Sequence, residues 1–132
     1  MNLRPMIMAD ADFLLALKNY PETRQFAIIT HDEIKKEDHL KYLEQNLQHF
    51  QIIESGSEMI KYGAIRIQYN DISIWIAREL WGKGIATWIL EKVSEKGMTA
   101  KIVNSNIASM RAFINAGFKP VSYQRNYYIF QK

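Results

Sequence analysis

The chain has 132 residues, a length that suits one domain and is too short for two, so we expect a single domain over residues 1–132. Hydrophobic residues make up 48% of it, which excludes a disordered chain, and the absence of cysteine excludes disulfides, a thiol nucleophile and thiolate metal ligands. The net charge of +3 favours an anionic ligand, whereas the even spread of the lysines argues against a nucleic-acid partner.

The sequence indicates neither a membrane segment nor a metal site. No apolar run approaches the about 20 residues that a membrane-spanning helix needs, and the first five residues lack the apolar core of a signal peptide. The three histidines are scattered, without the spacing of metal ligands. We therefore expect a cytoplasmic protein with no membrane partner and no metal.

The first part of the chain predicts one short strand followed by two helices. Residues 3–5 form the expected strand. Residues 10–19 have the spacing of an amphipathic helix, which Pro21 ends, whereas residues 21–32 lack a regular pattern. A second amphipathic helix is expected over residues 34–48.

The middle of the chain is rich in strand signals. We expect strands over residues 50–54, 59–69 and 72–76, because β-branched and apolar residues alternate there between short turns. The last of these strands runs into the turn Gly82-Lys83-Gly84. An apolar stripe at helical spacing follows the turn and predicts a helix there; its residues are Ile85, Trp88, Ile89 and Val93.

The last third predicts a strand, a helix and a closing hairpin. Gly97 is the expected C-cap of the preceding helix. After it we expect a strand over residues 98–103, a helix capped by Ser105 or Asn106, and a hairpin over residues 119–131. The whole order indicates an α/β (α+β) fold with a mixed, mostly antiparallel sheet flanked by helices. An exposed hairpin could pair with a second copy, which leaves a homodimer open.

The glycine turn has the features of an anion site. Two glycines allow the backbone to approach a ligand closely, and the first turn of a helix offers unpaired N–H groups and a partial positive charge. Lys83 adds a full charge, so the turn predicts phosphate binding. The alternative is an ordinary tight turn, because Thr87 replaces the third glycine of a dinucleotide fingerprint and no Gly-Lys-Ser/Thr follows.

A wider pattern resembles the GNAT superfamily of N-acetyltransferases. Residues 79–86 are similar to its coenzyme A signature, Arg/Gln-x-x-Gly-x-Gly/Ala, although Glu79 replaces the Arg or Gln and Arg78 is adjacent to it. Residues 106–118 are similar to its Asn-x-x-Ser/Ala-x-x-x-Tyr motif with a following Gly-Phe. The two motifs occur in the family's order, and the resemblance covers nearly the whole chain. It implies the GNAT fold, in which the central strand and the next strand splay apart and the cofactor enters the gap.

The resemblance also implies acetyl-CoA as the cofactor. The strand over residues 72–76 would pair with the pantetheine arm as an added strand does, and the backbone N–H of Ile76 would act in catalysis at the thioester oxygen. Without a ligand, the isoleucines would be ordinary core residues and Asn106 an ordinary N-cap. The implied cofactor-binding residues are Ile74, Ile76, Trp81, Gly82, Lys83, Gly84, Ile85, Ala86, Thr87, Asn106, Ser109 and Phe113.

Two departures from the family concern proton transfer. Phe113 stands where members usually carry the tyrosine that protonates the leaving thiolate, and residues 98–103 hold none of the carboxylates that many members use as a base. Such acid–base help is worth roughly 10²–10⁴-fold, so its loss slows a reaction without abolishing it. Asp71 is the candidate replacement as catalytic base, and the hairpin tyrosines are further substitutes: Tyr123, Tyr127 and Tyr128. Ordinary packing within the hairpin is the alternative for these tyrosines.

The N-terminal half resembles the branch of the superfamily that acetylates amino groups of nucleotide-linked sugars, as in pseudaminic acid biosynthesis. The segments that carry this resemblance are residues 17–24 and 38–43. It implies that Lys18 and His39 face the nucleotide, and Arg66 on a neighbouring strand could join them as a substrate-binding residue. A half-buried structural histidine and a solvated lysine at a helix end are the alternatives.

The function expected from these patterns is transfer of acetyl from acetyl-CoA to a primary amine of a small molecule, with a nucleotide-linked amino sugar as the preferred acceptor. The pattern is shared by acetyltransferases of ribosomal proteins and peptide N-termini, so these remain an alternative. Because the proton-transfer residues are missing, a non-catalytic module that binds coenzyme A or a partner is the other alternative.

Overall fold

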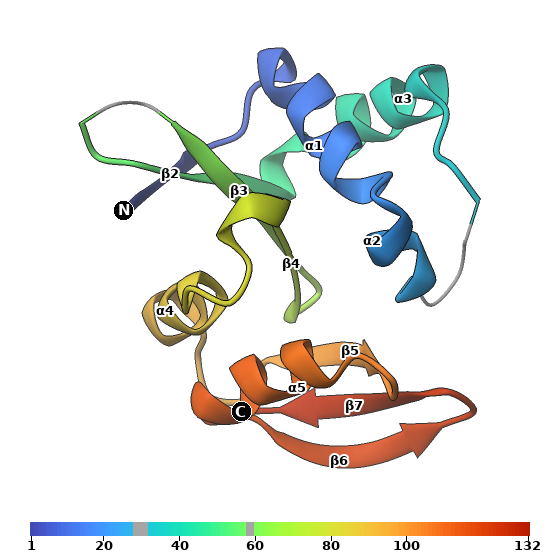
Figure 1. Ribbon diagram of the computed structural model, residues 1–132, viewed down its shortest axis with the longest axis vertical. Coiled ribbons are helices and arrows are strands. Elements are labelled where there is room, and N and C mark those ends of the chain that lie inside the picture. The colour runs from blue at the N-terminus through green and yellow to red at the C-terminus, as the bar shows by residue number, and fades with distance from the viewer. Residues whose placement is uncertain (28–31, 58–59) are drawn as a thin grey trace.

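Within the described residues, which are 1–27, 32–57 and 60–132, the computed structural model has one mixed sheet. Its strands lie in the order β1-β2-β3-β4-β5-β7-β6 (Figure 1). The only parallel pair recorded among them is β4–β5. The predicted α/β fold with a mostly antiparallel sheet is therefore confirmed. The strand bounds are β1 Asn2–Pro5, β2 Phe50–Glu54, β3 Lys61–Gln68, β4 Asp71–Ile76, β5 Thr99–Val103, β6 Lys119–Gln124 and β7 Tyr127–Gln131.

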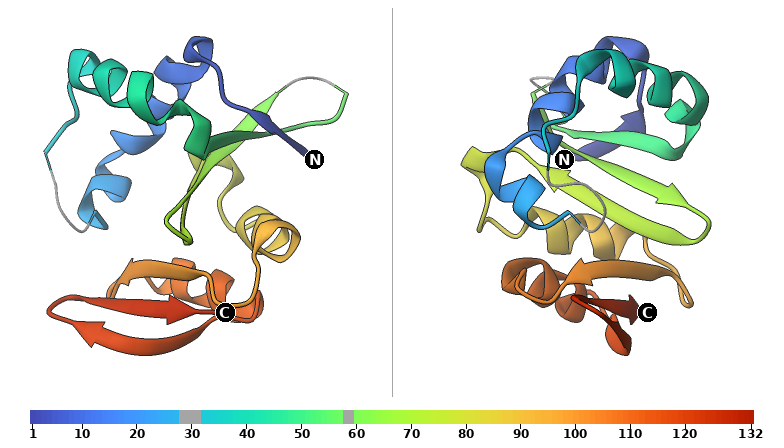
Figure 2. Two further views of the ribbon diagram at one scale, coloured as in Figure 1. Left: turned by 180° about the vertical axis from the view of Figure 1, so that it is seen from behind. Right: turned by 90° about the vertical axis from the view of Figure 1, so that its right-hand side faces the viewer.

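Helices cover both faces of this sheet (Figures 1 and 2). Apolar residues of α1 and α3 pack on one face in a cluster with Phe50 and Ile52, and those of α4 and α5 pack on the other in a cluster with Ile53 and Ile65. The α-helices are α1 Ala11–Lys18, α2 Pro21–Gln25, α3 Lys36–Asn46, α4 Ile85–Val93 and α5 Ile107–Asn115. Short 3₁₀ turns are η1 Met8–Asp10, η2 Leu47–His49 and η3 Arg78–Leu80.

The two central strands, β4 and β5, meet only at their starts. Their pairing is restricted to Asp71 with Thr99, where the Thr99 N–H donates to the Asn70 carbonyl at 2.9 Å. Beyond this point the strands diverge, and Figure 1 shows β4 in the upper part of the molecule and β5 in the lower part. The expected splay of the central strand and the next one is confirmed.

Three details differ from the sequence expectations. Residues 21–25 form α2 rather than an irregular segment, because Pro21 occupies the first turn of a new helix after ending α1; residues 28–31 lie outside the described part. Helix α4 ends at Val93, so Gly97 is not its C-cap but shapes the turn into β5 with a φ of 95°. The helix expected over residues 34–48 is shorter, since its last turn tightens into η2.

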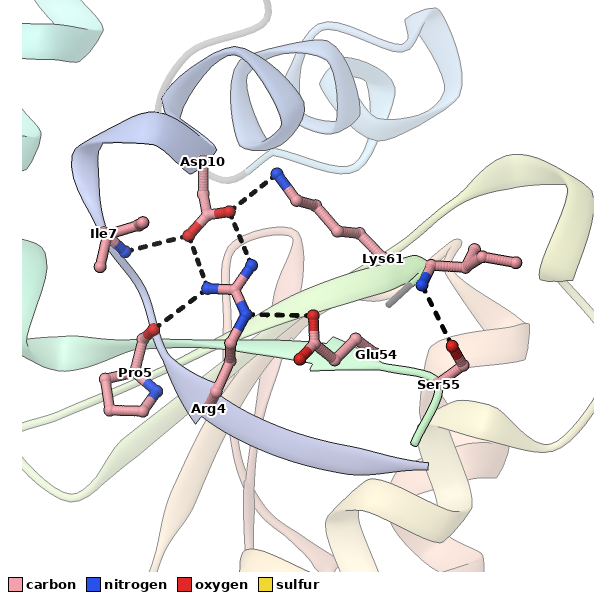
Figure 3. A network of polar contacts seen from close by, with 8 residues as sticks. Arg4, Pro5, Ile7, Asp10, Glu54, Ser55 and Lys61 are labelled. Carbon is pink, nitrogen blue, oxygen red and sulfur yellow. Dashed lines mark hydrogen bonds and ion pairs between the residues drawn. The ribbon is translucent and has the colours of Figure 1, made fainter. Parts of the chain in front are cut away.

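A charged network anchors the N-terminal strand (Figure 3). The Arg4 guanidinium donates to both Asp10 carboxylate oxygens at 2.9 Å and to Glu54 Oε2 at 3.0 Å. Lys61 Nζ lies 2.8 Å from Asp10 Oδ1, and the Ile7 N–H donates to Asp10 at 3.0 Å. The network joins β1, η1, β2 and β3, and hydrogen bonding by Arg4 holds the pKa of Asp10 well below its ordinary value.

Gly63 is required where β3 passes β4. It pairs with Ile76, and a Cβ atom built on it would collide with the Trp75 carbonyl oxygen. We expect Gly63→Ala to lower the free energy of unfolding by about 1–3 kcal/mol, as overpacked sites do. Urea unfolding measures this change. Gly56→Ala is the matched control, since a Cβ there meets nothing within 4 Å, and an equal loss in both variants would contradict the argument.

Candidate functional site

A cleft of about 1360 Å³ lies where β4 and β5 diverge. Both strands line it, together with the glycine turn, α5 and the N-terminal helices. Among the expected cofactor-binding and substrate-binding residues and Asp71, Lys83 is the one that does not line it. Those that do are Lys18, His39, Arg66, Asp71, Ile74, Ile76, Trp81, Gly82, Gly84, Ile85, Ala86, Thr87, Asn106, Ser109 and Phe113.

The glycine turn forms an open, uncapped helix start. Gly82 and Gly84 have φ values of 77° and 78°, in the left-handed region that glycine favours. Gly84 is the N-cap of α4, and no side chain caps the helix. The Trp88 N–H donates to the Gly84 carbonyl at 3.0 Å, so the N–H groups of residues 85–87 precede the helical hydrogen bonds. A Cβ at either glycine would meet nothing within 4 Å, which leaves room for a phosphate group.

Strand β4 directs alternate backbone groups into the gap. Because the Asn70 carbonyl faces β5 and the Ala77 N–H donates to Tyr62 of β3 at 2.9 Å, alternation turns the backbone groups of Ile72, Ile74 and Ile76 toward the gap. The Ile76 carbonyl accepts a hydrogen bond of 2.8 Å from the Trp81 indole N–H. The gap is therefore lined by strand-type donors and acceptors that an extended ligand could pair with.

The α5 side of the cleft combines a capped helix start with an aromatic core. The Asn106 side chain caps α5 by accepting from the Ser109 N–H at 3.3 Å, so Asn106 rather than Ser105 is the cap. Phe113 is 5% exposed and packs edge-on against Phe118, with ring centroids 5.0 Å apart. Among the hairpin tyrosines proposed as substitutes, only Tyr127 lines the cleft.

Asp71 lies at the closed end of the cleft, beside the point where β4 and β5 pair. Its carboxylate accepts from the Thr99 hydroxyl at 2.9 Å, and Lys101 Nζ lies 3.7 Å away. An Arg66 guanidinium nitrogen lies 4.0 Å from the other carboxylate oxygen. Two cations and a hydroxyl thus compete for the lone pairs that a general base would use.

Lys18 stands over a cage of three aromatic rings. Its Nζ lies 5.1 Å from the centroid of Tyr42, 5.3 Å from Phe50 and 5.0 Å from Trp75. Burial, and secondarily the charge of Arg66, lowers the pKa of Lys18 to about 8. The lysine is therefore not the solvated helix-end cation that the sequence also allowed, and it presents a desolvated amine to the cleft.

Arg66 and His39 complete this side of the cleft. Arg66 donates to the Tyr42 hydroxyl at 3.3 Å and to the Ser73 hydroxyl at 3.4 Å. His39 is buried, and its Nε2 lies 3.0 Å from the Ala11 carbonyl. Burial, followed by the charge of Lys18, lowers the pKa of His39. The ring thus serves as a structural link between α3 and α1 while it also lines the cleft.

Sequence reasoning missed several residues of this wall. Trp75 alternates with Ile74 and Ile76, so its place on the opposite face could have been read from the strand period. Tyr42 follows His39 by three positions and shares its helix face, which is a similar signal. The positions of Lys101 and Thr99 next to Asp71 depend on the parallel pairing of β4 with β5, which no local pattern indicates.

Metal ligation and membrane insertion find no support in the described residues. No group of three or more histidine, cysteine, aspartate or glutamate side chains in them could hold a metal ion. Among the helices of the same ranges, none has the length and apolarity needed to cross a membrane.

Comparison with known proteins gives a consistent family and fold. The family model described as acetyltransferase (GNAT) domain matches residues 1–119. No curated protein sequence matches the chain at a significant level. A domain from Methanocaldococcus jannaschii is similar in structure, with a TM-score of 0.81 and 23% identity, over 99% of this chain and 96% of that chain.

Two further structures share the fold at lower identity. The ribosomal-protein-alanine N-acetyltransferase of Brucella melitensis has a TM-score of 0.78 and 19% identity, covering 100% of this chain and 99% of its own. The spermidine N-acetyltransferase of Vibrio cholerae, in complex with CoA and spermine, has a TM-score of 0.78 and 14% identity, covering 98% of this chain and 91% of its own.

Proposed function

Because the chain belongs to the acetyltransferase (GNAT) domain family and is thus an acetyl-CoA-dependent N-acetyltransferase, we propose that its acceptor is a primary amine on a negatively charged small molecule. A nucleotide-linked amino sugar is the acceptor class we propose. One observation carries this choice, which is the group of three cations, Lys18, Arg66 and Lys101, on the cleft wall that includes Asp71.

Three cations and Asp71 line this acceptor side of the cleft, which Glu22, Asp32 and Asp38 also line. Arg66 lies 4.0 Å and Lys101 3.7 Å from the Asp71 carboxylate, and Lys18, which is half-buried over its three aromatic rings, lines the same cleft. These three cations would repel a polyamine, whereas the anionic oxygens of a diphosphate would pair with them. The ring faces of Tyr42 and Trp75 also offer stacking surfaces to a base or sugar.

The cofactor fits the opposite side of the cleft. The unpaired N–H groups of Ile85, Ala86 and Thr87 would hold its pyrophosphate, with Lys83 as a nearby charge. The gap-facing backbone groups of Ile74 and Ile76 would pair with the amides of its arm, and the Ile76 N–H would stabilise the oxyanion. Bound acetyl-CoA supplies the acetyl thioester, and the chain contributes its orientation.

Proton transfer is proposed to depend less on side chains than is usual. Phe113 carries no proton to donate, and Asp71 already accepts from Thr99. Of the substitutes considered, Tyr127 has access to the cleft and is the candidate acid for the leaving thiolate. The cations Lys18, Arg66 and Lys101 favour binding of the acceptor amine in its neutral form, so water can remove the remaining proton.

Two experiments test the proposed function. The first is calorimetric titration of acetyl-CoA into the protein, where we expect saturable binding of one molecule per chain. The second follows thiol release with three acceptors at equal concentration: a nucleotide-linked amino sugar, a peptide with a free N-terminus, and spermidine. Release with the amino sugar alone supports the proposal, release with the peptide favours the protein-acetylating alternative, and binding without any release favours a non-catalytic module.

The lowered pKa of Lys18 gives the acceptor side a pH signature. Lys18 is charged below about pH 8 and neutral above it, so affinity for an anion should fall as the pH rises through that value. A nucleoside diphosphate without the amine is the suitable probe, because its own charge changes little there. We expect up to about tenfold weaker binding on going from about pH 7 to about pH 9 in calorimetry.

Lys18→Met is the variant that separates this effect from others. It should bind the diphosphate weakly at both pH values and remove the pH dependence. A pH dependence that persists unchanged in Lys18→Met would contradict a role for this lysine in anion binding.

A further inference from the structure

We propose that in the free protein the Trp81 indole occupies the place on β4 where the cofactor arm pairs, and that it must leave this place when the cofactor binds. This inference rests on the proposed function, because it takes the cofactor arm to pair with the gap-facing edge of β4. Pairing of the cofactor arm with β4 would have to replace a hydrogen bond that Trp81 makes to this strand.

The contact is the hydrogen bond from the Trp81 indole to the Ile76 carbonyl, at 2.8 Å. That carbonyl belongs to the set of β4 groups turned toward the gap. An extended ligand that adds to this edge offers amide N–H groups to the same acceptors. The indole N–H is a donor of the same kind, so the side chain and the ligand compete for one position.

Packing does not account for the position of the indole. Trp81 is 44% exposed, and it belongs to neither apolar cluster of the described residues. A tryptophan that gains little from burial is held by its polar and edge contacts instead. Its place is therefore open to competition from a ligand that satisfies Ile76 equally well.

A set of contacts between η3 and the start of α2 keeps the indole in place. The ring of Tyr20 meets Trp81 edge-on, with centroids 6.2 Å apart, and the Arg78 guanidinium lies 4.4 Å from the centroid of Tyr20. Arg78 also donates to Glu22 at 2.7 Å. Tyr20 and Glu22 lie at the start of α2, so the segment before the glycine turn is tied to the acceptor side of the cleft. Displacement of the indole by the cofactor would loosen this tie and change the entrance for the acceptor.

The first test compares the affinity of two variants for acetyl-CoA by calorimetry. Trp81→Phe keeps an aromatic ring and removes the N–H, so the cofactor no longer competes with it. We expect acetyl-CoA to bind about two- to tenfold more tightly, as the loss of one competing hydrogen bond implies. Trp88→Phe is the matched control, since Trp88 packs under Lys92 on α4 and does not line the cleft, and its affinity should equal that of the wild type.

The second test observes the indole itself. The chain has three tryptophans, and the ¹H–¹⁵N resonance that disappears in Trp81→Phe identifies the Trp81 N–H. Addition of acetyl-CoA to the wild-type protein should move this resonance toward the position of a free indole. Tyr20→Leu, which removes the ring that Trp81 and Arg78 both contact, should bind the cofactor more tightly by a smaller factor than Trp81→Phe.

The outcomes separate this inference from the proposed function. Equal or weaker binding by Trp81→Phe, with an indole resonance that stays unchanged while the cofactor binds, overturns the inference alone. Absence of acetyl-CoA binding in the wild type and in all three variants overturns the cofactor assignment and this inference with it.

Discussion

Gly82→Asp is expected to abolish measurable binding of acetyl-CoA while the fold survives. A side chain at this φ of 77° is strained, and a carboxylate beside the first turn of α4 would repel the phosphates placed there. The two effects together should weaken binding on the order of a hundredfold or more. Calorimetric titration measures the affinity, and far-ultraviolet circular dichroism checks the fold.

Gly97→Asp is the matched control for this prediction. Gly97 also has a positive φ, of 95°, and a Cβ there meets nothing within 4 Å, but the residue does not line the cleft. The same charge and the same kind of strain are therefore introduced away from the proposed phosphate site. A folded Gly82→Asp protein that binds acetyl-CoA as well as Gly97→Asp does would refute the assignment of the glycine turn.

Arg4→Met is expected to produce the largest loss of stability. The substitution removes the hydrogen bonds to Asp10 and Glu54, whose side chains are nearly inaccessible to water. Removing one partner of a buried ion pair leaves an uncompensated charge, and we expect a loss of about 3 kcal/mol, because Lys61 still faces Asp10. That is a large share of the 5–15 kcal/mol that typically stabilises a domain, and urea unfolding measures it.

Lys36→Met provides the comparison for an exposed pair. Lys36 Nζ lies 3.2 Å from Asp12, but both side chains are well exposed, so its removal should cost less than about 1 kcal/mol. Similar losses in Lys36→Met and Arg4→Met would show that burial of the Arg4 network contributes nothing.

The contribution of the same network to the free energy of unfolding should depend on pH in acid solution. The pKa of Asp10 is lowered in the folded protein, so its contribution to stability is present above its unfolded value of 3.8 and is lost as the pH falls below that value. In Arg4→Met this acid-dependent loss of stability should be smaller, because the hydrogen bond from Arg4 is the largest cause of the lowered Asp10 pKa. An identical acid dependence in the two proteins would contradict that cause.

The elements and the cofactor side of the cleft could be predicted from local sequence patterns. Strand alternation located β3 and β4, and the glycine turn identified the start of α4, because each signal lies within a few neighbouring residues. The sequence did not predict α2, since Pro21 ends one helix and begins the next. Gly97 was assigned to the wrong turn because glycine marks helix ends and other positive-φ turns alike.

The acceptor side could not be predicted in the same way. The cage around Lys18 takes its rings from α3, β2 and β4, and the partners of Arg4 come from η1 and from β2. Such groups meet only after the sheet has formed, so a solvated lysine and a caged lysine have the same local sequence. His39 shows the same ambiguity, since its structural bond to Ala11 and its place on the cleft wall both follow from the packing of α3 on α1.

The divergence of β4 and β5 also bears on how this sheet avoids aggregation. An unpaired strand edge attracts strands of other chains, and proteins commonly blunt such edges with proline or irregular pairing. Both outer strands have these features, since β1 ends at Pro5 and β6 contains Pro120 beside a register shift. The edges without such features are the diverging edges of β4 and β5, which face each other in the middle of the sheet. The edge left open for pairing is thus one that a slender extended ligand can reach more easily than another polypeptide strand can.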